Sequence, residues 1–178
     1  EAGIRAKMQA APPRLLIAGG DGSVGTAARV VCGTKTELAI LPGGTLNHFA
    51  RDHGIPTDLR KAVQVAASGK VMKADVAYVD DRLFLNTSSV GAYVAYVRLR
   101  DRAEKYVGYR LASLLAAFRL FVSMRPVALE LDVEGKRVTY DTPVVFIGVG
   151  ERETKSPTLV NRILGGRHCL HVIVVRER

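Results

Sequence analysis

The chain has 178 residues, of which 48% are hydrophobic, and 26 basic residues outnumber 17 acidic ones to give a net charge of +9. A chain of this length and composition can bury a substantial core, which excludes a disordered protein and fits one large domain or two small ones. The positive charge favours an anionic partner, namely a nucleotide, a nucleic acid or a membrane surface. No spacing typical of nucleic-acid-binding motifs is present, so we expect no nucleic-acid partner.

No apolar stretch approaches the length of a transmembrane helix, and we expect no signal peptide. Cys32 and Cys169 lie far apart in the sequence and form neither a metal-binding motif nor a disulfide framework. The four histidines lack the spacing of a ligand set, so we expect no zinc site. Together these features predict a cytoplasmic protein.

The first part of the chain alternates apolar strands with helical patterns. In order, we predict an exposed helix end within 1–13, a buried strand at 15–18, a helix at 24–32, a buried strand at 37–41, a helix at 45–53 with Thr45 as its N-cap, and a helix over 59–68 capped by Asp58. This alternation is typical of a parallel, doubly wound α/β sheet. We therefore predict an α/β domain over residues 1–73.

The pattern changes after residue 73, and we predict a β-rich second domain with inserted helices over residues 74–178. Its predicted elements are a hairpin of strands 74–79 and 82–88, a helical region over 94–124 interrupted near Gly108 and ended by Pro126, a hairpin of strands 127–133 and 136–140 with a two-residue turn, and apolar strands at 144–148 and 170–175. The fold class is thus an α/β nucleotide-binding type of domain followed by a second domain of antiparallel character.

Two glycine-rich loops follow the two apolar strands of the first domain. The first loop is Gly19-Gly20-Asp21-Gly22-Ser23, where glycines let the backbone approach a phosphate and the following helix N-terminus favours an anion. A carboxylate such as Asp21 would repel phosphate, so its functional interpretation is a magnesium-linked residue or one that orients an attacking hydroxyl. The alternative is a strand-to-helix turn in which Asp21 only caps the helix.

The second loop is Pro42-Gly43-Gly44-Thr45-Leu46-Asn47-His48-Phe49-Ala50-Arg51. Gly43 and Gly44 clear space for a ligand, while Thr45 and Asn47 offer a hydroxyl and an amide. Two such loops side by side can hold the phosphates of a nucleotide between them. Neither loop has the Gly-Lys-Ser/Thr ending of a P-loop or the spacing of a dinucleotide fingerprint.

These residues carry a family resemblance. The first loop resembles the GGDGT motif shared by diacylglycerol kinases, sphingosine kinases and NAD kinases, and the stretch 41–51 resembles the more specific P-x-G-T-x-N-D-F-A-R stretch of the diacylglycerol kinase catalytic domain. Further similarity lies in Gly54-Ile55-Pro56, Asp75-Val76 and Phe84-Leu85-Asn86. The resemblance runs from about residue 15 to residue 175.

The resemblance implies ATP-dependent phosphorylation of a lipid hydroxyl, with Mg²⁺. Asp21 would be the acidic catalytic or metal-linked residue, and Gly19–Gly25 with Thr45 would line the ATP site. The motifs and the resemblance together predict that the nucleotide is bound by Gly19, Gly20, Asp21, Gly22, Ser23, Val24, Gly25, Gly43, Gly44, Thr45 and Asn47.

The chain departs from the family pattern at four places. An opening strand and nucleotide loop expected before Leu15 are missing, and His48 stands where the family has Asp. An Asp-Gly pair that forms a metal site in many members is replaced by Arg167 and His168. The Asp-Gly-Glu stretch with the proposed general base is expected beyond residue 178, so we expect a kinase core truncated at both ends.

Two other functions stay open at this point. One is phosphorylation of a soluble substrate, as NAD kinases do, and the other is a non-catalytic module that binds nucleotide or lipid. The helical region Arg98–Arg125 combines basic residues with an apolar stripe. Its first interpretation is a helix that packs against the core with a solvated basic face, and its second is a peripheral surface that meets anionic lipid at the inner face of the membrane.

Overall fold

The computed structural model describes residues 1–123, 126–156, 159–163 and 165–175. The chain divides into two compact units, of which the first joins Glu1–Asn86 to Val149–Leu170 and the second joins Thr87–Gly148 to His171–Arg178. The division predicted at residues 73–74 stays a prediction, because compactness in space does not test which segments fold as independent domains.

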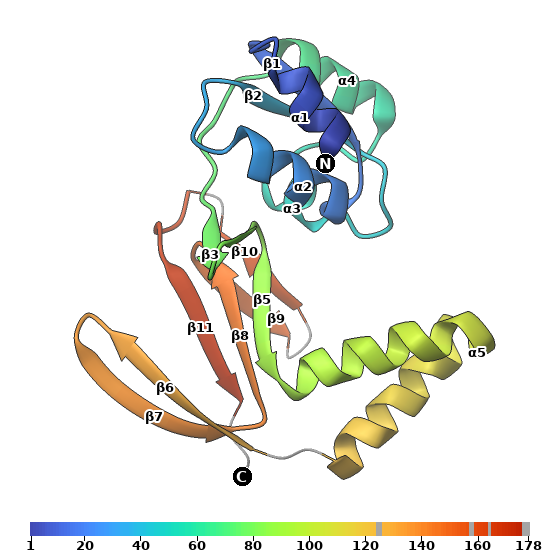
Figure 1. Cartoon of the computed structure of the whole chain (residues 1–178), viewed down its shortest axis with the longest axis vertical. Helices are drawn as coiled ribbons and strands as arrows, with labels where there is room; N and C mark the ends of the chain where they lie inside the picture. The colour runs from blue at the N-terminus through green and yellow to red at the C-terminus, as the bar shows by residue number, and fades with distance from the viewer. Residues whose placement is uncertain (124–125, 157–158, 164, 176–178) are drawn as a thin grey trace. The chain divides into compact units, whose positions relative to one another are not determined.

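The first unit begins with a parallel pair of strands and their helices. Its elements up to residue 68 are α1 (Ala2–Met8), β1 (Arg14–Gly19), α2 (Asp21–Val31), β2 (Glu37–Pro42), α3 (His48–Asp52) and α4 (Leu59–Ser68) (Figure 1). β1 and β2 pair in parallel from Arg14 opposite Glu37 to Gly19 opposite Pro42. This register places the carboxyl ends of the two strands side by side, and a glycine-rich loop leaves each end.

The core of this unit lies between α2, α3 and the strands. Its buried members are Val24, Ala28, Ile40, Phe49, Ala50, Leu83 and Leu85. The prediction that strand 15–18 is buried is wrong for one face, because Leu16 is 55% exposed while Ile17 packs against the core. β1 alternates in burial because only one of its faces packs against the core.

Two short antiparallel hairpins complete the first unit. β3 (Ala77–Val79) pairs with β4 (Arg82–Phe84), and β9 (Arg152–Ser156) pairs with β10 (Leu159–Arg162). The strand predicted at 82–88 is therefore wrong in its extent, since it divides into β4 and a separate strand, β5 (Thr87–Gly91). The β9–β10 hairpin was not predicted from the sequence.

The second unit contains a three-stranded sheet of order β11-β8-β5 and a two-stranded ribbon. Its further elements are α5 (Ala92–Ser123), β6 (Val127–Val133), β7 (Lys136–Thr142), β8 (Val144–Val149) and β11 (Leu170–Val175). The predicted two-residue turn is confirmed, since Glu134 and Gly135 between β6 and β7 both have positive φ, of 53° and 81°. The chain is thus a mixed α/β fold with parallel and antiparallel sheets, and the doubly wound arrangement stays a prediction.

The long helix α5 bends at Gly108, whose φ of 75° and ψ of 162° are not helical, as the sequence predicted. Its apolar stripe is not packed into the core, because Leu114 is 67% and Phe118 is 69% exposed, while only the small Ala112 and Ala116 are buried in this part of the helix. The first interpretation of this region, a core-packing helix, is therefore wrong for the described residues. None of the described helices combines the length and the hydrophobicity that a membrane crossing needs.

Candidate functional site

The two glycine-rich loops touch through their backbones. The N–H of Gly43 donates a hydrogen bond to the carbonyl oxygen of Gly19 over 3.0 Å. A Cβ atom built on Gly20 would lie 3.0 Å from Cα of Gly44, and one built on Gly44 would overlap Cα of Gly20. No side chain fits between the loops, so glycine is required by this close approach.

Asp21 joins the first loop to the second. Its Oδ2 accepts a hydrogen bond from the backbone N–H of His48 at 3.1 Å, and its Oδ1 accepts one from the N–H of Phe49 at 3.0 Å. Asp21 thus caps the N-terminus of the short helix α3 from another element, and its charge is favourable at that end of the helix. Each carboxylate oxygen keeps a lone pair for a further partner.

Asn47 shapes the second loop from within. Its Oδ1 accepts a hydrogen bond from the N–H of Gly44 at 2.8 Å, its Nδ2 donates to the carbonyl of Gly44 at 2.6 Å, and the residue is buried with φ of 50°. This turn delays the helix, so the prediction of a helix over 45–53 capped by Thr45 is wrong: α3 begins at His48, and Asn47 is its N-cap residue. The amide of Asn47 is engaged in the loop, whereas Thr45 is exposed.

The N-terminus of α2 offers backbone donors beside this contact. The N–H of Val24 donates to the carbonyl of Gly20 at 3.0 Å, while the described residues provide no acceptor for the N–H groups of Gly22 and Ser23, which are both exposed. Free N–H groups at a helix N-terminus attract an anion. The side chain of Val24 instead packs in the core, so this residue can contribute only its backbone.

The predicted nucleotide-binding residues therefore fall into groups. The structure brings Gly19 and Gly20 against Gly43 and Gly44, and it places the exposed Gly22 and Ser23 on the adjacent first turn of α2. Contact of any of these residues with a nucleotide stays a proposal.

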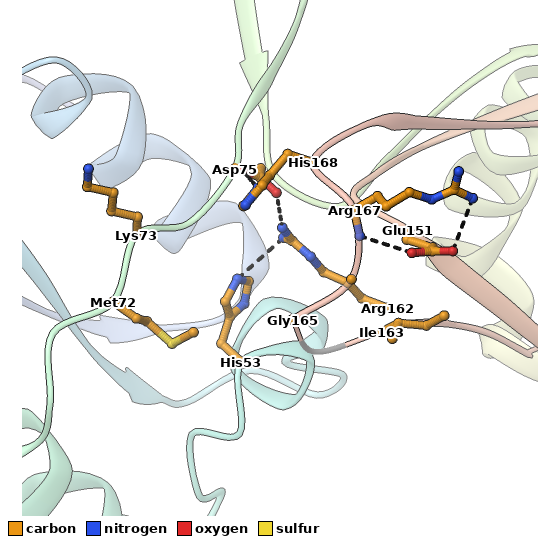
Figure 2. Close-up of a pocket in the computed structure, with 11 residues that line it drawn as sticks. His53, Met72, Lys73, Asp75, Glu151, Arg162, Ile163, Gly165, Arg167 and His168 are labelled. Atoms are coloured by element: carbon orange, nitrogen blue, oxygen red, sulfur yellow. Dashed lines mark hydrogen bonds and ion pairs between the residues drawn. The ribbon is translucent and has the colours of Figure 1, made fainter.

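A second polar cluster, which the sequence analysis did not find, surrounds a cavity in the same unit. The cavity is lined by His53, Met72, Lys73, Asp75, Glu151, Arg162, Ile163, Gly165, Gly166, Arg167 and His168 (Figure 2). Figure 2 shows the guanidinium of Arg162 between His53 and Asp75. Its Nη2 donates to Asp75 Oδ2 at 2.6 Å, and its Nη1 lies 3.3 Å from Nε2 of His53.

Burial shifts the pKa of several groups in and beside this cluster. Burial lowers the pKa of His53, and the positive charge of the nearby Arg162 lowers it further. The hydrogen bond from His53 Nδ1 to the Phe49 carbonyl, at 2.8 Å, acts in the opposite direction and raises the pKa. Burial also raises the pKa of Asp52, which Arg152 opposes from 3.8 Å. The neutral imidazole of His53 therefore donates through Nδ1 and accepts from Arg162 through Nε2.

The signal that could have revealed this cluster is weak in the sequence. Asp75 lies 87 residues before Arg162 and 93 before His168, and the polar β9–β10 hairpin that carries Arg162 lacks the apolar alternation of a strand. The family resemblance marked Asp75 and the replacement of an Asp-Gly pair by Arg167 and His168, but it did not connect these residues with one another.

The family-model comparison and two curated relatives agree on one family. Residues 3–79 match the model described as diacylglycerol kinase catalytic domain. The chain is 27% identical over 145 residues to a probable lipid kinase YegS-like of Cronobacter sakazakii, covering 76% of the chain and 46% of that protein. It is also 27% identical over 139 residues to a diacylglycerol kinase of Staphylococcus aureus, covering 76% and 44%. The chain spans about half the length of these curated relatives.

Solved structures show the same fold. A putative diacylglycerol kinase from Bacillus anthracis superposes with a TM-score of 0.64 at 22% identity, covering 84% of this chain and 52% of that one. A second structure of a putative diacylglycerol kinase from this organism gives a TM-score of 0.68 at 20% identity and covers 98% and 61%.

Proposed function

The chain belongs to the diacylglycerol kinase catalytic-domain family, and we propose that it forms the nucleotide-binding core of an ATP-dependent lipid kinase. The reaction transfers the γ-phosphate of ATP to the hydroxyl group of a diacylglycerol-like lipid. The backbone contact between Gly20 and Gly44 carries the proposal. Because both loops have glycine at this contact, no side chain covers their backbone at the carboxyl ends of the parallel strands β1 and β2. This is the edge of the sheet where α/β proteins bind phosphate-containing ligands.

The first turn of α2 supplies the phosphate contacts in this proposal. The N–H groups of Gly22 and Ser23 bind phosphate oxygens, and the absence of a side chain at Gly22 lets the phosphate approach. Catalysis of phosphoryl transfer relies mainly on positioning and on charge neutralisation. The backbone contact between the two glycine-rich loops would hold the phosphates of ATP in position.

Asp21 is the proposed catalytic residue. Its two hydrogen bonds from α3 fix the carboxylate, and its remaining lone pairs can accept a proton from the lipid hydroxyl or bind magnesium-bound water. Such a carboxylate fits a magnesium-linked role beside a phosphate site. Mg²⁺, which enters with ATP as the metal–nucleotide complex, would offset the charge of the phosphates.

Helix α5 supports a peripheral contact with an anionic membrane. Its exposed apolar residues Leu111, Leu114, Leu115 and Phe118 recur at helical spacing. Arg110 and Arg119 flank this stripe in the sequence and are both exposed. An apolar stripe between basic side chains is typical of a helix that lies at the surface of an anionic bilayer.

The test is phosphate transfer from radiolabelled ATP to a total lipid extract by the full-length protein, with Asp21→Asn as the matched variant. We expect a labelled lipid with the wild type and its loss with the variant, by a factor of roughly 100 to 1,000 if Asp21 stabilises the transition state. Circular dichroism of both proteins checks that the variant still folds, because Asn can accept only one of the two hydrogen bonds from α3.

Other outcomes would assign a different function. Labelling of NAD rather than lipid, in a competition between the two, would show a kinase of a soluble substrate. Binding of ATP without transfer to any acceptor would show a non-catalytic module.

A further inference from the structure

Asp75 lies between the side chains of Arg162 and His168. Its Oδ2 accepts a hydrogen bond from Arg162 Nη2 at 2.6 Å, and its Oδ1 lies 2.7 Å from Nδ1 of His168. The side chain of Arg162 is 10% exposed and that of Asp75 is 28% exposed, so their ion pair is largely shielded from water. Both oxygens of this carboxylate therefore have partners that carry, or can carry, positive charge.

Arg162 is held on its other sides as well. Its Nη1 donates to the neutral imidazole of His53, whose own Nδ1 donates to the backbone of α3. A Cβ atom on Gly150, which has φ of 76°, would lie 2.7 Å from Nε of Arg162, so the guanidinium lies directly against this backbone. The position of Arg162 is thus built into the fold and is not an accident of a flexible surface side chain.

The second carboxylate at the cavity is also engaged by an arginine. Glu151 Oε2 accepts from the backbone N–H of Arg167 at 2.9 Å, and Glu151 Oε1 accepts from Nη2 of the same residue at 3.2 Å. Figure 2 shows this pair beside the Arg162 group. Two arginines thus each bind a carboxylate at this cavity: Arg162 at the end of β10 and Arg167 in the loop that follows it.

This donor set does not fit a divalent cation. Magnesium and calcium bind through several oxygen ligands, whereas guanidinium groups have no lone pair to donate and repel a cation. Within the described ranges, no group of three or more His, Cys, Asp or Glu side chains could hold a metal ion. The residues at this cavity therefore do not suit the metal that many family members bind through an Asp-Gly pair at the positions of Arg167 and His168.

We propose that Arg162 and His168 take the place of a divalent cation at Asp75, so that this part of the fold is held by an ion cluster and not by metal. Arginine suits this role because it stays charged and forms directed hydrogen bonds with a carboxylate. The cluster joins the β9–β10 hairpin to Asp75 and α3, all within the first unit. The inference concerns stability and does not depend on the kinase reaction.

The test is thermal unfolding of the full-length protein without nucleotide, in EDTA and in millimolar MgCl₂ or CaCl₂. We expect the same midpoint in all three conditions for the wild type. Asp75→Asn should unfold at a lower temperature in all three, because Arg162 loses its charged partner. Asp81→Asn is the matched control, since Asp81 is exposed in the β3–β4 turn, and it should unfold as the wild type does.

Two results would overturn the proposal. One is an Asp75→Asn protein that unfolds at the same temperature as the wild type, and the other is a fall of the wild-type midpoint in EDTA that Asp75→Asn abolishes. An EDTA effect that persists in Asp75→Asn would locate the metal elsewhere and leave the cluster as proposed. If Asp75→Asn does not fold, the metal content of the wild type purified without chelator decides. No bound magnesium or calcium supports the proposal, and one bound equivalent in the wild type that His168→Ala loses would refute it.

Discussion

Replacing Gly44 by alanine should separate the two loops. The new Cβ would overlap Cα of Gly20 and would lie 3.3 Å from the backbone nitrogen of Gly20 and 2.9 Å from Asn47 Oδ1. Backbone atoms at the end of a strand cannot rotate away as a side chain can, so the loops must move apart. Overpacking of this kind costs about 2 kcal/mol, which corresponds to a fall in the unfolding midpoint of roughly 4–8 °C for a chain of this size.

The assay is thermal unfolding of the full-length Gly44→Ala protein beside Gly22→Ala. Gly22 is the matched control because a Cβ there meets no atom within 4 Å. Gly22→Ala should therefore keep the midpoint of the wild type, and the higher helix propensity of alanine opposes any loss. An unchanged midpoint for Gly44→Ala would refute the close contact of the loops.

Three further changes test other parts of the fold. Asp58→Ala removes the N-cap of α4 and should lower the free energy of unfolding in urea by about 1 kcal/mol; no change would contradict the cap. Burial lowers the pKa of His53 below its usual 6.5 in the folded protein. As pH drops through 6.5, the unfolded chain therefore takes up a proton on His53 before the folded protein does, and the free energy of unfolding should fall. His53→Gln should weaken this dependence, and an equal slope would exclude His53 as its source. Reversing the charges of Arg110 and Arg119 should weaken binding to anionic liposomes at low salt; unchanged binding would remove α5 from the membrane contact.

Local patterns predicted most of the elements because the forces that form them are local. The Asp58 cap, the turn at Glu134-Gly135 and the interruption at Gly108 each depend on residues within one turn of chain, and the structure confirms all three. The glycine pairs likewise predicted two loops after two strands. Their contact follows from the parallel register of β1 and β2.

The errors arise where distant residues decide the local structure. The start of α3 depends on Asp21, which caps it from another element, and on the hydrogen bonds of Asn47 with Gly44. The Asp75 cluster depends on Arg162, which lies 87 residues away along the chain. No periodicity in a single sequence records such pairings. The cap predicted at Asp21 was for the helix that follows the first loop, whereas the structure shows Asp21 capping α3 instead. Its catalytic role stays a proposal.

Titration of ATP into the full-length protein tests the phosphate site most directly, with Gly22→Ala and Gly3→Ala compared to the wild type. Both glycines lie in helices with open space around the missing Cβ, so neither variant should lose stability. The account predicts that Gly22→Ala loses at least about tenfold in ATP affinity, or about 1.4 kcal/mol, while Gly3→Ala binds as the wild type does. Equal affinity of all three proteins would contradict a phosphate site on the first turn of α2.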